Sequence, residues 1–335
     1  MKRTISISLV VLAAVCLFRA SQLLNTAHAQ DEQGRGHVEH RVNPESLPDN
    51  SNAPETSRGN RPGVGDALTT GGTGVVTPAI TYHGGPVIAT PTIYLIWYGN
   101  WNQSNGSDNL AGQNIVRDFA SNIGGSPYFQ LNTTYSAGGT NITGNANLGS
   151  NGVFEATDTG SAGTRLRDSS ILNIVNNAIS GGKLPYDING VYFVLTSSNI
   201  SEQSGFCTRY CGWHTANNGS VGHLRYSFVG NANRCLSACA AQTNGPNGNA
   251  GVDGMISVIA HELEEATSDP DLNAWYDSGG SENADKCAWT FGHAQYLAAN
   301  GAWANMRLGT RDFLIQRNLQ HNTSGDLCKV NANQN

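Results

Sequence analysis

A histidine and three glutamates lie close together in the C-terminal half of the chain, at His261, Glu262, Glu264 and Glu265. Apolar residues recur around them at helical spacing, so we expect a helix that ends before Pro270. In such a helix His261 and Glu265 lie one turn apart on one face, where both can bind a single divalent ion. Glu262 points about 100° away and takes the place of the general base in hydrolases with an H-E-x-x-H motif. The H-E-x-x-E pattern therefore predicts a metal site with Glu262 as a catalytic base outside the ligand shell.

The segment after this helix supplies acidic residues for a third metal ligand. Glu282 and Asp285 follow His261 at a spacing similar to that of metallopeptidases whose third ligand is an acid on a later element. Asp271 is the alternative, because it stands where compact H-E-x-x-H-x-x-G-x-x-H sites have their last ligand. Zinc is the first expectation for the ion, and calcium is the second because a carboxylate-rich loop also suits calcium. The competing interpretation is a helix histidine beside an exposed acidic face, with no metal.

Other chemistry-bearing residues are less specific. His214 and His223 lie near cysteines and polar loops, and they are candidates for a fourth ligand or for a hydrogen-bond donor to a transition state. The sequence contains no G-x-S-x-G nucleophile elbow, no P-loop and no Rossmann fingerprint. These absences argue against serine hydrolase and nucleotide chemistry.

The N-terminus has the pattern of an export signal. A basic start precedes an apolar stretch at residues 5–18, and an A-x-A cleavage site ends at Ala29. Because this stretch is too short to span a membrane, we expect a signal peptide at residues 1–29 and a secreted, extracellular protein without a membrane anchor. Only 13% of the residues are charged and the net charge is -6 without any Lys/Arg cluster, which argues against a nucleic-acid partner.

Removal of this signal peptide takes away Cys16 and leaves six cysteines, an even number suited to disulfides in an oxidising compartment. Zinc binding by the two C-x-x-x-C pairs is the alternative. Closure of the roughly forty-residue loop between the last two cysteines should stabilise the fold by a few kcal/mol and tie the C-terminal tail to the acidic segment. We expect the pairing that joins neighbours in sequence, which is Cys207 with Cys211, Cys235 with Cys239, and Cys287 with Cys328.

Residues 30–75 have no apolar periodicity, and they mix Pro and Gly with both signs of charge. Such a segment cannot bury enough apolar surface to offset the entropy lost on ordering, so we expect a disordered leader. His37 and His40 lie in it and are interpreted as solvated histidines. Ordered structure is expected from Val76 onward.

The rest of the chain alternates strand and helix patterns. The order indicates an α/β or α+β fold, and the motif makes it a single zincin-like domain with a mixed sheet and a long motif-bearing helix. We expect buried strands at 93–98 and 191–196, a half-exposed edge strand at 224–229, short strands within 126–147, and helices at 111–123, at 169–178 and from about 254.

Several blocks of sequence carry a resemblance to a known family: YHGGP (82–86), IYLIWYGNW (93–101), VYFVLT (191–196), GFC (205–207) with CGWH (211–214), and GVDGM (251–255). In this order they resemble the phosphate-induced protein 1 or EXORDIUM family of secreted proteins. The resemblance implies an EXORDIUM-like domain at 76–335, an extracellular location and a link to plant growth and cell-wall expansion, but no established reaction. The H-E-x-x-E run and the acids after it look more like microbial members of the family and like zinc-peptidase helices.

Two functions follow from these observations. The first is a secreted metalloprotein, a zinc-dependent hydrolase of peptidase-like type, in which Glu262 activates water. The second is a non-enzymatic extracellular protein of the cell wall or of growth signalling, in which the acidic site is structural or residual. An extracellular protein or a cell-wall polysaccharide is the expected partner.

Overall fold

The computed structural model of the protein describes residues 38–41 and 68–332. The expected signal peptide at residues 1–29 lies outside the described residues, as does most of the leader expected at 30–75. The described part of that leader contains strand β1 (Val38–Arg41). Residues 68–75 carry no helix or strand.

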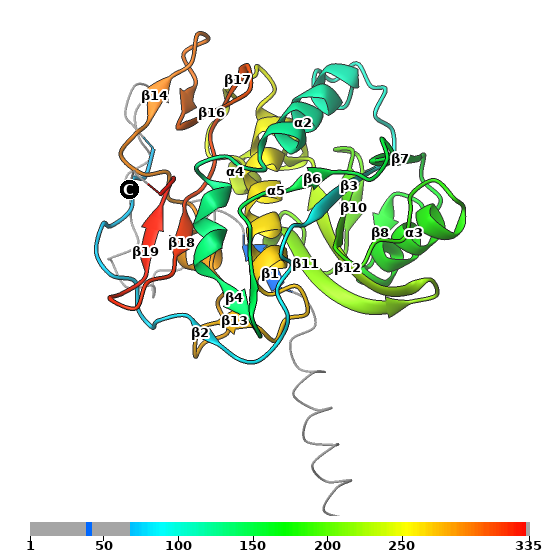
Figure 1. The fold of residues 1–335 in the computed structure, drawn as a ribbon. Helices are drawn as coiled ribbons and strands as arrows, with labels where there is room; N and C mark the ends of the chain where they lie inside the picture. The colour runs from blue at the N-terminus through cyan, green and yellow to red at the C-terminus, as the bar shows by residue number, and fades with distance from the viewer. Residues whose placement is uncertain (1–37, 42–67, 333–335) are drawn as a thin grey trace, which may run out of the picture. The chain divides into compact units, whose positions relative to one another are not determined.

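A seven-stranded mixed sheet lies at the centre of the described chain (Figure 1). The strand order is β1-β11-β12-β9-β3-β6, and β7 also pairs with β3. β3, β9 and β12 run parallel to one another, whereas β11 is antiparallel to both β12 and β1. The remaining strands of the sheet are β3 (Thr92–Tyr98), β6 (Asn147–Leu148), β7 (Glu155–Asp158), β9 (Gly190–Thr196), β11 (Tyr210–Gly219) and β12 (Gly222–Gly230).

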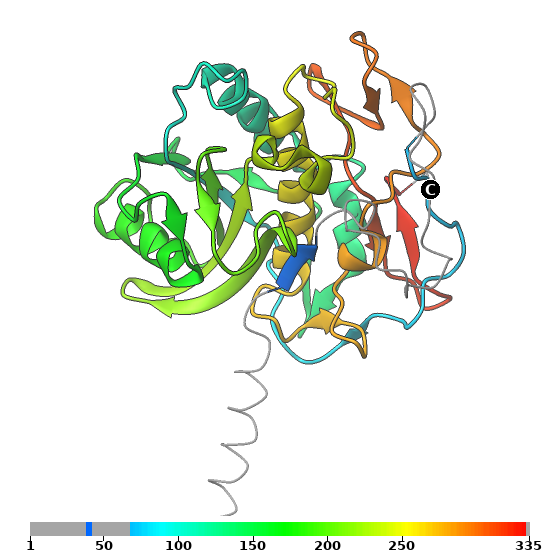
Figure 2. The same cartoon turned by 180° about the vertical axis from the view of Figure 1, so that it is seen from behind.

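The central strands are continuous apolar runs because both faces of the sheet are covered. All seven residues of β3 and all seven of β9 are buried, which is typical of parallel strands between helical layers. Helix α5 packs on one face with α2 beside it, and α3 lies across the sheet from them (Figures 1 and 2). The helices are α2 (Leu110–Asn122), α3 (Asp168–Ser180), α4 (Leu236–Cys239) and α5 (Ala250–Ser268).

Helix α5 carries the motif and lies in the interior. The side chain of Asn249 accepts a hydrogen bond from the backbone N–H of Val252 and so caps the first turn. The helix ends at Ser268, shortly before Pro270, as the sequence predicts. Its polar residues are buried together with its apolar ones, so they need partners inside the protein.

Short hairpins and turns complete the fold, and within residues 38–41 and 68–332 no helix is long and apolar enough to cross a membrane. The short strands are β2 (Thr81–Tyr82), β4 (Ser136–Ala137), β5 (Thr140–Asn141), β8 (Arg165–Leu166), β10 (Ser201–Glu202), β13 (Trp275–Tyr276), β14 (Tyr296–Leu297), β15 (Trp303–Ala304), β16 (Met306–Leu308), β17 (Arg311–Phe313), β18 (Asn318–Gln320) and β19 (Leu327–Lys329). The 3-10 helices are η3 (Phe129–Thr134), η4 (Ala232–Arg234) and η5 (Asp285–Cys287).

Most predicted elements are present, but one assignment is wrong. The strands expected at 93–98 and 191–196 are β3 and β9, and the helices expected at 111–123 and 169–178 are α2 and α3. The strand expected at the edge at 224–229 is β12, which lies between β9 and β11. This error has one cause. The sequence patterns do not predict β11, and β11 pairs with β12 along the side predicted to be an edge of the sheet.

The disulfides correct two of the three predicted pairs. Cys207 bonds Cys235 and Cys211 bonds Cys239, with Cα atoms 5.8 Å and 5.5 Å apart. Cys235 and Cys239 lie about one helical turn apart at α4, so they share a face. Cys239 therefore bonds Cys211 of β11, and Cys235 bonds Cys207 in the turn before β11, so the two bonds fasten α4 to the sheet.

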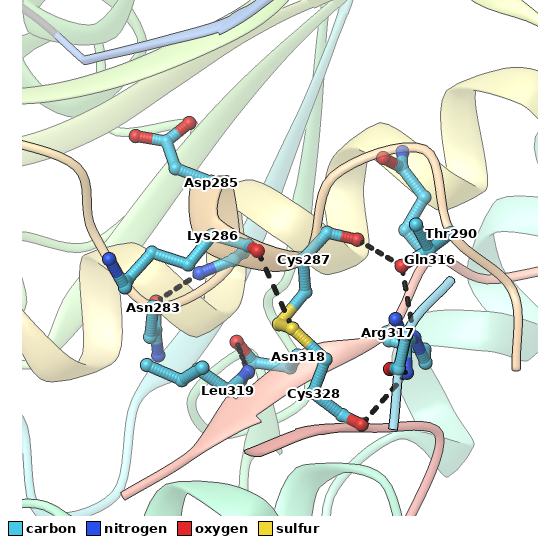
Figure 3. The surroundings of a disulfide bond; sticks show 12 residues. Asn283, Asp285, Lys286, Cys287, Thr290, Gln316, Arg317, Asn318, Leu319 and Cys328 are labelled. Carbon is cyan, nitrogen blue, oxygen red and sulfur yellow. Dashed lines mark hydrogen bonds between the residues drawn. A yellow bond between two sulfur atoms is a disulfide. The ribbon is translucent and has the colours of Figure 1, made fainter. Parts of the chain in front are cut away.

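The third pair, Cys287 with Cys328, is as predicted. It joins η5 to β19 (Figure 3). Hydrogen bonds surround it: Thr290 Oγ1 donates to the carbonyl of Cys287 at 2.6 Å, and Arg317 Nη1 donates to the carbonyl of Cys328 at 3.1 Å. The segment that begins with Asp285 is thereby held in place.

Candidate metal centre

The motif residues of α5 meet an acid from the following segment. His261 Nε2 lies 2.9 Å from Glu265 Oε1, the residue one turn later. Asp285 Oδ1 lies 3.5 Å from the same nitrogen, and the backbone N–H of Asp285 donates to Glu265 Oε1 at 3.0 Å. His261 and Glu265 are buried, whereas the Asp285 side chain is 22% exposed. Asp285 therefore forms the outer side of this group.

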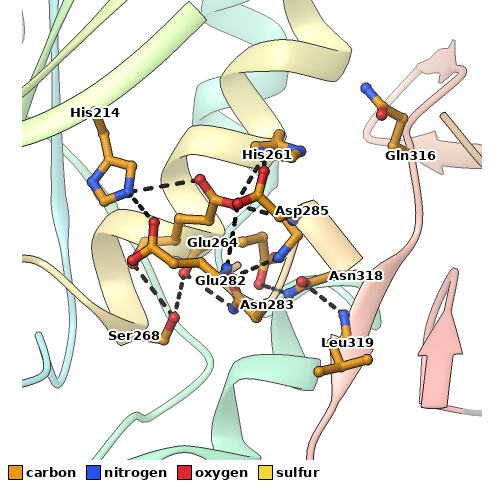
Figure 4. Close-up of polar contacts among 12 residues, drawn as sticks. His214, His261, Glu264, Ser268, Glu282, Asn283, Asp285, Gln316, Asn318 and Leu319 are labelled. Atoms are coloured by element: carbon orange, nitrogen blue, oxygen red, sulfur yellow. Dashed lines mark hydrogen bonds and ion pairs between the residues drawn. The ribbon is translucent and has the colours of Figure 1, made fainter. Parts of the chain in front are cut away.

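A second histidine approaches the same glutamate from the sheet. His214 on β11 places Nε2 at 2.9 Å from Glu282 Oε2 and at 3.6 Å from Glu265 Oε2. Figure 4 shows His214 and His261 on opposite sides, with carboxylates between them. The two oxygens of Glu265 thus face two different histidines. The side chains in these contacts are all buried: His214, Glu265 and Glu282.

The spacing of these atoms can be compared with that of a zinc site. Zinc binds nitrogen and oxygen ligands at about 2.0–2.2 Å in a tetrahedron, which sets neighbouring ligand atoms about 3.3–3.6 Å apart. The described residues contain two groups whose possible ligand atoms lie within 4.8 Å of one another. The first group is His261, Glu265 and Asp285, and the second is His214, Glu262 and Glu265. The first group offers three possible ligands, which is the number of protein ligands in an open zinc site. The second shares Glu265 with it.

The carboxylates make this region attractive to cations. Burial disfavours a charged His261 imidazole, but Glu265, Asp285 and Glu262 outweigh that effect and raise its pKa well above the usual range. Burial raises the pKa of Glu265 to about 7, although His261 acts in the opposite direction. Protons on these groups and a divalent ion would therefore compete for the same negative charge.

Glu262 lies beside the sheet. Gly212 of β11 is its neighbour, since a Cβ atom added at Gly212 would lie 3.2 Å from Glu262 Oε1 and 2.6 Å from Val258 Cγ1. The absence of a side chain at Gly212 therefore lets the motif helix approach the strand closely. Glu262 also belongs to the group with His214 and Glu265, so its carboxylate lies next to the first group without being part of it.

Glu264 faces another direction. Its side chain accepts a hydrogen bond from Asn318, and its backbone carbonyl accepts one from Asn283 Nδ2 at 3.4 Å. Burial raises the pKa of Glu264 well above the usual range. The interpretation of these glutamates as an exposed acidic face is wrong, because Glu262, Glu264 and Glu265 all have an exposed fraction of 0%.

Asp271, the alternative third ligand, has other partners. Arg225 contacts both of its carboxylate oxygens, at 2.8 Å and 3.0 Å, and His223 Nε2 lies 2.9 Å from Oδ1. Among the described residues, neither group with metal-ligand geometry includes Asp271 or His223. The structure thus brings His261, Glu265 and Asp285 together, places Glu282 with His214, and leaves Asp271 in an ion pair.

His214 was named from the sequence only as one of two unplaced histidines. Its position depends on β11, a strand that the sequence patterns do not predict. The usable signal was the run Tyr210–Thr215, whose six residues are all buried and mostly aromatic, small or β-branched. Read as a strand, that run points His214 and Gly212 to the same face of the sheet.

The fold and the cluster define a mixed α/β protein with a histidine–carboxylate site at a buried helix. Residues 80–310 match the conserved region of phosphate-induced protein 1. EXORDIUM-like 3 of Arabidopsis thaliana is 34% identical over 247 residues, which are 64% of this chain and 69% of that protein. EXORDIUM-like 5 of the same plant is 31% identical over 280 residues, 71% of this chain and 74% of that protein. The chain belongs to the phosphate-induced protein 1 family, and no solved structure matches it.

Proposed function

We propose that this protein is exported, binds a divalent metal ion with zinc in first place and calcium in second, and hydrolyses peptide bonds with Glu262 as the general base. The ligands in the proposal are His261, Glu265 and Asp285. Glu282, which the sequence also suggested as a ligand, would instead orient His214.

One observation supports this proposal above the others. His261 Nε2 lies 2.9 Å from Glu265 Oε1 and 3.5 Å from Asp285 Oδ1. The side chains of His261 and Glu265 are buried. Buried charged groups need a compensating partner, and a divalent ion would give one to the whole set.

The chemistry of the chain follows from the position of Glu262. A bound zinc ion would polarise a substrate carbonyl and make water a better nucleophile at neutral pH. Glu262, close to Glu265 and His214, would accept the proton of that water and return it to the leaving amine. The antiparallel strand β11 beside helix α5 also supports a zincin-like arrangement.

Export is supported by two independent features. Residues 1–29 have the composition of a cleaved signal. The six remaining cysteines form three disulfides, and such bonds persist in oxidising compartments outside the cytosol.

A non-enzymatic extracellular role, in the cell wall or in signalling, is the second candidate. It is favoured by the burial of the cluster, since His261, Glu262 and Glu265 are at most 1% exposed. A metal bound there would be structural, as in closed zinc sites.

Replacing the base separates these two functions. We expect Glu262→Gln to retain the metal and to lower the cleavage of a denatured-protein mixture at least about a hundredfold, as measured by mass spectrometry of the products. Glu264→Gln is the matched control, because Glu264 faces Asn318. Equal cleavage by the Glu262→Gln variant, or none by the unmodified metal-loaded protein, would support the non-enzymatic function.

A further inference from the structure

The outer edge of β11 is paired with a strand from the start of the chain. β1 runs antiparallel to β11 in the register Val38 with His214, Glu39 with Trp213, His40 with Gly212 and Arg41 with Tyr210. On its other side β11 pairs with β12 from Gly212 to Gly219. Without β1, the backbone N–H and C=O groups of residues 210–214 on that side would lack a strand partner.

This edge lies next to the candidate metal centre. His214 contacts Glu282 and Glu265, and a Cβ atom added at Gly212 would lie 3.2 Å from Glu262 Oε1. Paired strands lie about 4.8 Å apart. Any strand added to this edge therefore passes alongside the groups that would carry out hydrolysis. Figures 1 and 2 show β1 at the same end of α5 in both views.

β1 is a four-residue strand that pairs with β11 through its backbone. Its sequence is Val-Glu-His-Arg, and it comes from a segment without apolar periodicity. Main-chain hydrogen bonds to an exposed edge do not depend on sequence, so another extended chain can replace such a strand.

We infer that the outer edge of β11 is a binding site for an extended peptide in antiparallel orientation, and that residues 38–41 are its internal occupant. The inference rests on the proposed function for the hydrolytic step, and it makes an extended polypeptide the substrate class. A polysaccharide lacks the alternating N–H and C=O groups that this edge requires. The leader segment would then compete with substrate until it is displaced.

Proline substitution in the full chain tests the inference. The double variant Glu39→Pro with His40→Pro removes two adjacent N–H groups and so prevents pairing, whichever of the two faces β11. The matched control, Glu39→Ala with His40→Ala, keeps both N–H groups. The probe is a fluorescein-labelled, end-blocked synthetic peptide with the sequence of residues 36–43, and its binding is followed by fluorescence anisotropy.

We expect the proline variant to bind the peptide at least about tenfold more tightly than the alanine variant, because a tethered strand competes at an effective concentration in the millimolar range. Amide hydrogen exchange in residues 210–215 should also rise in the proline variant, and added peptide should reverse the rise. Exchange in β9 should stay unchanged, which shows that the domain remains folded.

Three results would overturn the inference: equal peptide binding by both variants, loss of protection in β9 together with β11, or dimers of the proline variant in light scattering in place of peptide binding. The first result means that the edge takes no peptide, and the second that β1 is a permanent part of the sheet. The third means that a second copy of the chain is the occupant. Measuring the zinc content of the same protein after reloading keeps the two proposals apart, because peptide binding by a chain that retains no metal contradicts the proposed function alone.

Discussion

Glu265 is the residue on which the candidate site depends most. One of its oxygens faces His261 at 2.9 Å and receives the backbone N–H of Asp285, while the other faces His214 at 3.6 Å. The i, i+4 spacing of His261 and Glu265 could be read from the sequence because helix geometry fixes it. The choice between Asp285 and Glu282 could not, since it depends on His214, a residue of β11 that contacts Glu282.

The ion pair of Asp271 gives a prediction for stability against pH. Burial would raise the pKa of Asp271, but hydrogen bonds and charges from Arg225 and His223 outweigh it and lower that pKa. A carboxyl whose pKa is lower in the folded state stabilises the protein above its unfolded pKa of about 4, and this contribution is lost as the pH falls through the folded pKa. We expect Asp271→Asn to lower the free energy of unfolding by about 1–2 kcal/mol at pH 7.

Urea unfolding of both proteins between pH 7 and pH 3 measures this effect. The difference should shrink as the pH falls below about 4. The Asp271→Asn variant should also bind as much metal as the unmodified protein. A difference in unfolding free energy that grows in acid, or a loss of metal, would assign Asp271 a different role.

At the scale of elements, the contact between α5 and β11 depends on Gly212. A Cβ atom there would lie 2.6 Å from Val258 Cγ1 and 2.9 Å from the carbonyl oxygen of Phe228. We expect Gly212→Ala to lower the free energy of unfolding by about 1–3 kcal/mol, as overpacking in cores does. Gly72→Ala is the control, because a Cβ atom there would meet nothing within 4 Å. A Gly212→Ala variant as stable as the control would mean that α5 can move away freely.

The disulfides between α4 and the β11 region give a second prediction at this scale. A peptide map of the unreduced protein should contain Cys207 joined to Cys235 and Cys211 joined to Cys239. The double variant Cys211→Ala with Cys239→Ala should lose about 3 kcal/mol of stability to denaturant, because a loop closed in the unfolded state is released. A map that joins Cys207 to Cys211 would contradict the arrangement.

Elements with strong local signals could be predicted, and elements set by tertiary contacts could not. β3 and β9 are long apolar runs, and α5 combines a helical period with a stop at Pro270. β11 mixes a cysteine, two glycines and three asparagine or threonine residues with its aromatic ones, so its local pattern is weak. Because β11 is not predicted, β12 is wrongly expected at the edge of the sheet, two cysteine pairs are wrong, and His214 has no predicted position.

For the whole molecule, an ion at the cluster would join two parts of the chain directly and a third through a disulfide. The proposed ligands come from α5 and from the η5 segment, which the bond between Cys287 and Cys328 attaches to β19. A ligand that binds only the folded state stabilises it by about 2.7 kcal/mol at a hundred times its dissociation constant. Zinc at that excess should raise the midpoint of thermal unfolding of the unmodified protein by about 5 °C, as followed by circular dichroism. An equal rise in His261→Ala would place the ion elsewhere.

The most direct test is the metal content of the purified protein. The protein is stripped with a chelator, reloaded with zinc and freed of unbound ion, and its zinc is then measured by inductively coupled plasma mass spectrometry. We predict about one zinc ion per chain in the unmodified protein, in Glu262→Gln and in Asp271→Asn. His261→Ala and Glu265→Gln should retain almost none, although circular dichroism should show that they are folded. Two results would contradict the proposed metal centre. In the first, the unmodified protein retains neither zinc nor, after a parallel reloading, calcium. In the second, the His261→Ala variant retains as much metal as the unmodified chain.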